Sequence, residues 1–178
     1  MRPILFVLLL SMFSTQAQEL VIGEERVEPG IVFIFEGAIK DMIMPSSMHL
    51  AEDETHIHIE ARVNWDTKDL PEGTPAGGFI PYLTKTAKVT NEKTGLSTFI
   101  DLLPHINLID NFHYARNISL PGEVTDPYTV VFSFSPPTHK DLALHKDWVD
   151  TYGDKLAEGA EFTYKSVDFE EIAKASRR

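Results

Sequence analysis

The 178-residue chain contains no cysteine. This absence excludes disulfide bonds, thiolate metal sites, cysteine nucleophiles and copper sites that depend on a cysteine ligand. Basic residues are also scarce, because 16 lysines and arginines are outnumbered by 27 aspartates and glutamates, and the formal net charge is -11. We therefore expect no nucleic-acid partner, since binding to phosphates requires positive charge. A negative surface instead favours the approach of cations.

The sequence also lacks the common enzyme motifs. It has no G-x-S-x-G, no H-E-x-x-H, no glycine-rich phosphate loop and no zinc-finger spacing. We therefore predict that the protein is not an enzyme.

Long apolar runs are absent except near the start of the chain. Met1-Arg2-Pro3 precedes the apolar run Ile4 to Phe13, and small or polar residues follow as Ser14-Thr15-Gln16-Ala17. An apolar run of about ten residues is half of what a membrane-spanning helix needs. The three parts match a secretion signal, so we predict that residues 1–17 are a Sec signal peptide.

The rest of the chain has the pattern of an antiparallel all-β domain. Short apolar blocks rich in β-branched and aromatic residues alternate with Gly, Pro, Asn and Asp. We predict one immunoglobulin-like β-sandwich of about seven strands over residues 18–168, with two long loops at 64–81 and 136–157. The tail, 169–178, is expected to form a short solvated helix or a frayed end. Candidate strands cover residues 20–23, 31–38, 56–63, 82–89, 96–102, 113–120, 128–135 and 161–168.

One predicted strand carries the pattern His56-Ile57-His58-Ile59-Glu60. Side chains alternate between the two faces of a strand, so both histidines and the glutamate share one face while the isoleucines point to the core. Imidazole nitrogen and carboxylate oxygen suit Fe, Mn, Zn and Cu. The solvated face of an edge strand would show the same pattern, so the motif alone leaves both interpretations open.

A second stretch, Leu103 to Tyr114, contains His105, Asp110 and His113 around an expected turn. If that turn packs beside the first strand, three to five ligands converge on one ion. The alternative for His113 is a hydrogen-bonded structural histidine.

A third stretch, Met42 to His49, contains three methionines. Thioethers are soft ligands and favour copper(I). Methionine is also an adaptable core residue, so irregular filling of the core is the alternative interpretation.

Several blocks of the sequence, in the same order, resemble a known family. They are Glu19 to Glu24, Pro45 to Leu50, His58 to Ala61, Phe79 to Thr84, Asp110 to Tyr114 and Phe132 to Pro137. The family is that of the periplasmic iron(II)- and copper-binding proteins of the FetP type, which are encoded beside a high-affinity iron permease. The resemblance runs from Leu20 to Val167. It implies an immunoglobulin-like sandwich in the periplasm that forms a homodimer, with a metal site near the subunit interface.

The resemblance also implies which residues bind metal. The H-x-E pair of the family corresponds to His58 and Glu60, and the histidine of its D-x-x-H-Y turn corresponds to His113. Asp110 stands at the place of an acidic residue that the family can use for iron.

Two family ligands have no direct counterpart. The methionine seven residues before the turn histidine falls on Ile106, so His105 replaces it only if the loop carries one extra residue. The last histidine of the family falls on Ser133, and His139 or His145 from the long loop are candidates to replace it.

We therefore predict a metal carrier whose site consists of His58, Glu60, His105, His113 and Asp110. The expected ion is iron(II) or copper(II), with manganese and zinc as further candidates, because imidazole in place of a thioether makes the ligand set harder. The expected partners are a second copy of the chain and an inner-membrane iron permease. Affinity is expected to fall below about pH 6.5, where free imidazole gains a proton. The rival hypotheses are a periplasmic iron or copper redox protein and a metal-free adhesion or scaffold module.

Overall fold

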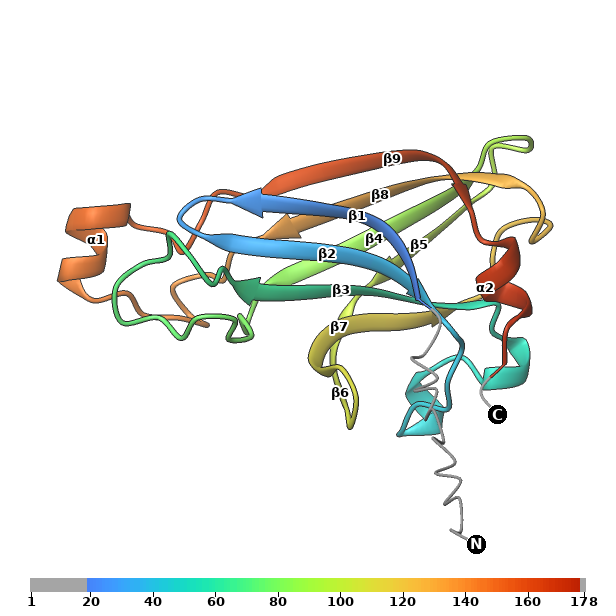
Figure 1. Cartoon of the computed structure of the whole chain (residues 1–178), viewed down its shortest axis with the longest axis horizontal. Coiled ribbons are helices and arrows are strands. Elements are labelled where there is room, and N and C mark those ends of the chain that lie inside the picture. The colour runs from blue at the N-terminus through green and yellow to red at the C-terminus, as the bar shows by residue number, and fades with distance from the viewer. Residues whose placement is uncertain (1–18, 177–178) are drawn as a thin grey trace, which may run out of the picture.

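The structure, a computed structural model that describes residues 19–176, is the predicted antiparallel β-sandwich (Figure 1). One sheet has the strand order β1-β2-β3-β7-β6 and the other the order β5-β4-β8-β9. The predicted signal peptide, residues 1–17, lies outside the described residues. The strands are β1 (Glu19–Val27), β2 (Ile31–Ala38), β3 (Ile57–Trp65), β4 (Thr84–Asn91), β5 (Ser97–Asp101), β6 (Leu103–Asn107), β7 (Asn111–Ile118), β8 (Pro127–Ser135) and β9 (Ala160–Asp168).

Phenylalanines on facing strands join the two sheets. The ring of Phe33 on β2 lies 4.5 Å from that of Phe134 on β8, and the ring of Phe35 lies 4.1 Å from that of Phe132, measured between centroids. Alternate residues of these strands therefore point into one shared core. Each such ring removes a large apolar area from water, and these contacts hold the sheets face to face.

Strand β6 was not among the predicted strands, although the turn expected between His105 and His113 is present. After β5 the chain passes through the buried Leu102 and joins the other sheet, where β6 pairs with β7. Pro104 explains the error, since proline cannot donate to a neighbouring strand and argues against strand structure. A proline is tolerated here because β6 is the edge strand of its sheet.

Residues 169–176 contain a short helix, as one of the two predictions had it, but this segment packs on the core, so the prediction that it is solvated is wrong. Phe169 is completely buried and Ile172 is 2% exposed. The ring centroid of Phe169 lies 5.7 Å from that of Tyr128. Helix α2 (Glu170–Lys174) follows directly after Phe169. A five-residue helix shows too few turns for its apolar period to be recognised in the sequence.

Both predicted long loops are present, at residues 66–83 and 136–159. The second contains helix α1 (Lys146–Tyr152), which lies at the far left of Figure 1. The connection between β2 and β3 lies toward the opposite end and contains the short 3-10 turns η1 (Ser46–Met48) and η2 (Glu52–Glu54). Within residues 19–176, no helix has the length and apolar character needed to cross a membrane.

Candidate metal centre

Strand β3 places His58 and Glu60 on the outer face of the five-stranded sheet. Ile57 and Ile59 alternate with them and are completely buried in the core, as predicted. The outer face is not solvated, however, because His58 is 3% and Glu60 2% exposed. The chain after β2 and the β6–β7 hairpin border a hollow over this part of the sheet. The alternative of a solvated edge strand is therefore wrong.

The β6–β7 hairpin brings two further histidines to the same place. His105 and His113 are directly opposite each other in the hairpin, and β7 pairs with β3. The ring centroid of His58 lies 5.3 Å from that of His105 and 6.1 Å from that of His113. Each of the three residues offers a nitrogen, and these atoms all lie within 4.8 Å of one another. Such a group has the size and chemistry to hold one transition-metal ion.

Hydrogen bonds orient two of these rings. Nδ1 of His58 lies 2.8 Å from the side-chain oxygen of Asn117, and Nδ1 of His113 lies 3.1 Å from the backbone oxygen of Asn111. Both oxygens are acceptors, so each Nδ1 carries the proton and each Nε2 keeps its lone pair. Outer hydrogen bonds of this kind fix the tautomer and orientation of histidine ligands in metal sites.

His105 is held differently. Both of its ring nitrogens are buried and have no hydrogen-bond partner. Burial, reinforced by the neighbouring imidazoles, lowers the pKa of His105 to about 3, and burial also lowers the pKa of His113. His105 is therefore neutral well below pH 6.5, and burial shifts the protonation of His113 in the same direction, so protonation of His105 does not limit metal binding near that pH.

Glu60 adds a carboxylate to the three imidazoles. Its Oε2 lies 3.6 Å from Nε2 of His113 and 3.9 Å from Nε2 of His58. Burial, together with the negative charge of Glu36 on β2, raises the pKa of Glu60 to about 8. Arg62 offsets part of this effect and donates to Glu36. A cation beside Glu60 would favour its ionised form and relieve the cost of burying it.

Asp110 lies in the turn of the hairpin and borders the same hollow. Its side chain accepts a hydrogen bond of 2.6 Å from the amide of Asn107 and is not part of the imidazole group. Its charge contributes to the raised pKa of Glu60. The structure therefore brings four of the five predicted residues together and places the fifth at the rim.

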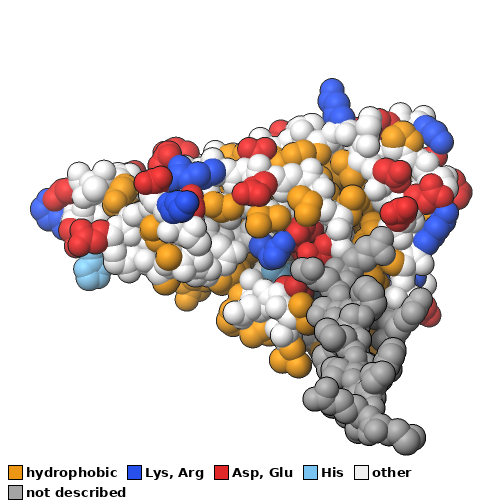
Figure 2. Space-filling model, in the orientation of Figure 1, with side chains coloured by type: hydrophobic (Ala, Val, Ile, Leu, Met, Phe, Trp, Pro, Cys, Tyr) orange, Lys and Arg blue, Asp and Glu red, His pale blue; other side chains and the backbone are white. Residues whose placement is uncertain are grey.

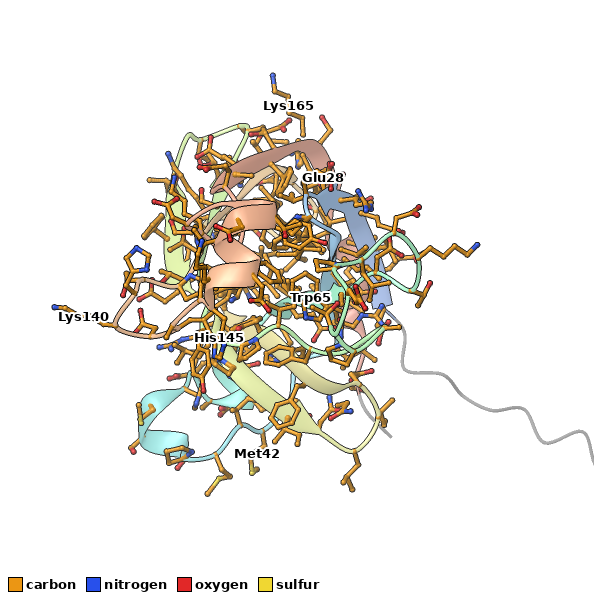
Figure 3. All side chains as sticks on the ribbon, turned by 90° about the vertical axis from the view of Figure 1, so that its left-hand side faces the viewer. Glu28, Met42, Trp65, Lys140, His145 and Lys165 are labelled. Carbon is orange, nitrogen blue, oxygen red and sulfur yellow. The ribbon has the colours of Figure 1, made fainter. Side chains whose placement is uncertain are left out.

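The other candidate residues lie elsewhere. His56 precedes β3, and its Nδ1 accepts the backbone N–H of Leu120. Ser133 is on β8 in the other sheet, where it donates to a glutamate of β9. His139 and His145 are exposed in the connection that contains α1, and neither borders the hollow, so neither replaces the missing family histidine within this chain. Figure 3 shows His145 at the end of the molecule that carries α1.

One histidine of the cluster was not predicted from the sequence. His49 borders the same hollow, whose volume is about 540 Å³, and its ring centroid lies 5.2 Å from that of His105. Nδ1 of His49 is buried and has no hydrogen-bond partner. In the sequence it stands beside the methionines and within the block Pro45 to Leu50 that resembles the family, but no periodic pattern places residue 49 on a face of the sheet.

The fold and the site together define a class of β-sandwich proteins with a buried histidine cluster on one sheet. Residues 16–170 match the family model of the Fe2+ transport protein, and the chain belongs to that family.

Solved structures share the fold. The chain is similar to FetP of uropathogenic Escherichia coli strain F11, with 22% identity, a TM-score of 0.68, and 84% of this chain and 95% of that chain covered. It is also similar to a copper-bound variant of Campylobacter jejuni P19, with 26% identity, a TM-score of 0.69, and 83% and 96% covered. A copper-bound variant of FetP matches with 22% identity, a TM-score of 0.68, and 85% and 99% covered. A comparison with curated proteins finds no match.

Proposed function

We propose that this protein is a periplasmic carrier of divalent metal, without catalytic activity, that acts in high-affinity iron uptake and passes its ion to an inner-membrane permease. The observation that carries the proposal is the group formed by His58, His105 and His113, whose nitrogens lie within 4.8 Å of one another beside Glu60. Membership of the Fe2+ transport protein family supports iron as the cargo. The copper-bound structures of FetP and P19 variants support copper as a second ion.

The donor set favours iron(II) over copper(I). Imidazole nitrogens and a carboxylate suit iron, manganese, zinc and copper(II), whereas a monovalent soft ion prefers sulfur. The net charge of -11 repels anions from the protein and attracts cations to it. We therefore place iron(II) first, copper(II) second, and manganese and zinc as further candidates.

Anaerobic titration calorimetry with iron(II) and with copper(II) tests the carrier. We expect the double variant His58→Ala/His113→Ala to lose tight binding of both ions, because two of the three converging imidazoles are removed. The matched control is His139→Ala/His145→Ala, which removes two exposed histidines that do not border the hollow and should bind like the wild type. Unchanged affinity in the first variant would overturn the assignment.

A redox protein would use the same ligands, so binding alone does not separate the two hypotheses. The two hypotheses are separated by measuring oxygen consumption in the presence of iron(II), with and without protein. A carrier leaves the rate at or below that of the buffer, whereas an oxidase raises it in proportion to protein concentration.

We propose further that the β6–β7 hairpin joins two copies of the chain. β6 is an edge strand, and the hairpin exposes Ile106, Leu108, Ile109 and Phe112, of which Leu108 is fully exposed. Figure 2 shows the apolar side chains gathered at the tip of this hairpin, at the lower edge of the molecule. A contiguous apolar patch of this kind is typical of an interface. Sedimentation analysis should show a dimer for the wild type and a monomer for Leu108→Glu/Ile109→Glu; a wild-type monomer would contradict this.

A further inference from the structure

The turn of the β6–β7 hairpin ends on a residue whose backbone conformation is uncommon. Asn111, the first residue of β7, has a φ of 62°, in the left-handed region. Asparagine is one of the few residues with a side chain that tolerate this region, whereas a β-branched residue is strained there. Asn107, the last residue of β6, lies directly across the hairpin from it. The residue type at position 111 therefore matters for the shape of the turn.

The carbonyl group of Asn111 is the partner of a cluster imidazole. Its oxygen lies 3.1 Å from Nδ1 of His113, two residues further along the same strand. In a regular strand the carbonyl groups lie near the plane of the sheet and pair with neighbouring strands, while side chains stand out from that plane. A residue in the left-handed region orients its carbonyl group differently from an extended residue. The contact with the ring of His113 therefore depends on the conformation of the turn.

Asn107 holds the turn in place. Its side-chain oxygen accepts the backbone N–H of Ile109 at 2.8 Å and that of Asp110 at 2.6 Å. Its amide donates to the carboxylate of Asp110 at 2.6 Å. An asparagine side chain that binds the backbone two residues further on is typical of an Asx turn. These contacts fix the chain immediately before Asn111.

The imidazole that depends on this turn faces the carboxylate of the cluster. Nε2 of His113 lies 3.6 Å from Oε2 of Glu60, and the ring is 2% exposed. The ring planes of His58 and His105 make angles of 82° and 75° with it. Nε2 has a lone pair for an ion only while the proton of the neutral ring is on Nδ1. Without an acceptor at Nδ1 the neutral ring exchanges between both tautomers, and in one of them an N–H points at the site.

We propose that Asn107 and Asn111 are positioning residues for metal binding. The turn that they form aims the carbonyl group of residue 111 at His113 and so keeps Nε2 of this ring free for the ion. His58 is oriented by a side chain, that of Asn117, whereas His113 is oriented by the main chain. The inference rests on the proposed function where it concerns the ion, but the tautomer of His113 is a property of the metal-free protein.

The test compares two exchanges at position 111. Asn111→Gly keeps the left-handed region accessible, whereas the branched side chain of Asn111→Val disfavours it. The matched control is Asp69→Val, which strains another residue of positive φ, 51°, that does not border the hollow of the cluster. Nitrogen-15 NMR of the metal-free protein at pH 8 shows which ring nitrogen of His113 carries the proton. The signal of this ring is identified by its loss in His113→Ala.

We expect the proton on Nδ1 of His113 in the wild type, in Asn111→Gly and in Asp69→Val, and a mixture of both tautomers in Asn111→Val. Anaerobic calorimetry with iron(II) should show binding about 10–100-fold weaker in Asn111→Val, as is typical when an outer hydrogen bond to a histidine ligand is lost. Asn111→Gly and Asp69→Val should bind like the wild type. An unchanged tautomer in Asn111→Val, or an altered tautomer with unchanged iron(II) affinity, overturns the proposal.

A second variant serves if Asn111→Val does not fold. Asn107→Ala removes the contacts that hold the turn without straining the backbone, and it should also give a mixture of tautomers at His113. This variant is judged by the NMR signal alone, because it releases the carboxylate of Asp110 as well. Retention of the proton on Nδ1 in Asn107→Ala overturns the proposal. A wild type that binds no iron(II) would instead contradict the carrier, and the positioning of His113 would then be decided by the NMR signal.

Discussion

Lys85 on β4 is a buried lysine, 3% exposed. Its replacement tests how the burial of an ionisable group changes the free energy of unfolding with pH. Its Nζ donates to the backbone oxygen of Leu83 at 2.9 Å and lies over the ring of Tyr114. Burial lowers the pKa of Lys85 from 10.5 to about 6. Between these values the unfolded chain binds a proton that the folded chain does not, so the free energy of unfolding rises with pH.

The magnitude follows from the slope, which is about 1.4 kcal/mol per pH unit for one proton. Lys85 should therefore make the wild type about 2.5 kcal/mol less stable at pH 7 than at pH 9, since the folded lysine is already mostly neutral at pH 7. The ring of Tyr114 favours the charged form and makes this an upper value.

Urea unfolding of the wild type and of Lys85→Met at pH 7, 8 and 9 measures the effect. The stability advantage of the variant should shrink by up to about 2.5 kcal/mol as the pH rises from 7 to 9, because only the wild type carries the titrating lysine. Lys88→Met, at an exposed position of the same strand, should show no such trend. A constant difference between wild type and Lys85→Met would mean that the buried lysine keeps its proton, and the reasoning would be refuted.

Three further predictions follow from single contacts. Asn117→Ala removes the acceptor that orients His58 and should weaken iron(II) binding by about 10–100-fold in calorimetry, as is typical for such outer hydrogen bonds. Phe169→Ala should lower the free energy of unfolding in urea by about 3–5 kcal/mol, because the ring is completely buried; a loss below about 1 kcal/mol would restore the idea of a dispensable tail. Gly23→Ala should destabilise the fold by about 1–3 kcal/mol in the same assay, since an added Cβ would lie 2.2 Å from the ring of Tyr164.

The alternation of side chains was sufficient to predict the sandwich and the inner and outer faces of β3. Alternation is a local property, so it could place His58 and Glu60 on one face but could not show that other segments cover that face. The coverage depends on the chain after β2 and on the hairpin, which are brought there by contacts between distant residues. For the same reason the burial of Phe169 and of Lys85 had no signal in the sequence, since each depends on what the opposite elements contribute.

Which face of the sheet His105 points to depends on the number of residues in the hairpin turn. Residues opposite each other in an antiparallel pair point to the same face, and a shift of one residue turns every side chain to the other face. His105 is opposite His113 and shares its face, whereas Ile106 is opposite Phe112 and is 64% exposed. One extra residue in the turn therefore brings the position eight residues before His113 into the cluster. The position seven residues before His113 then points to the other face. The cluster therefore contains the imidazole of His105 at this position, and its donor set consists of ring nitrogens and the carboxylate of Glu60.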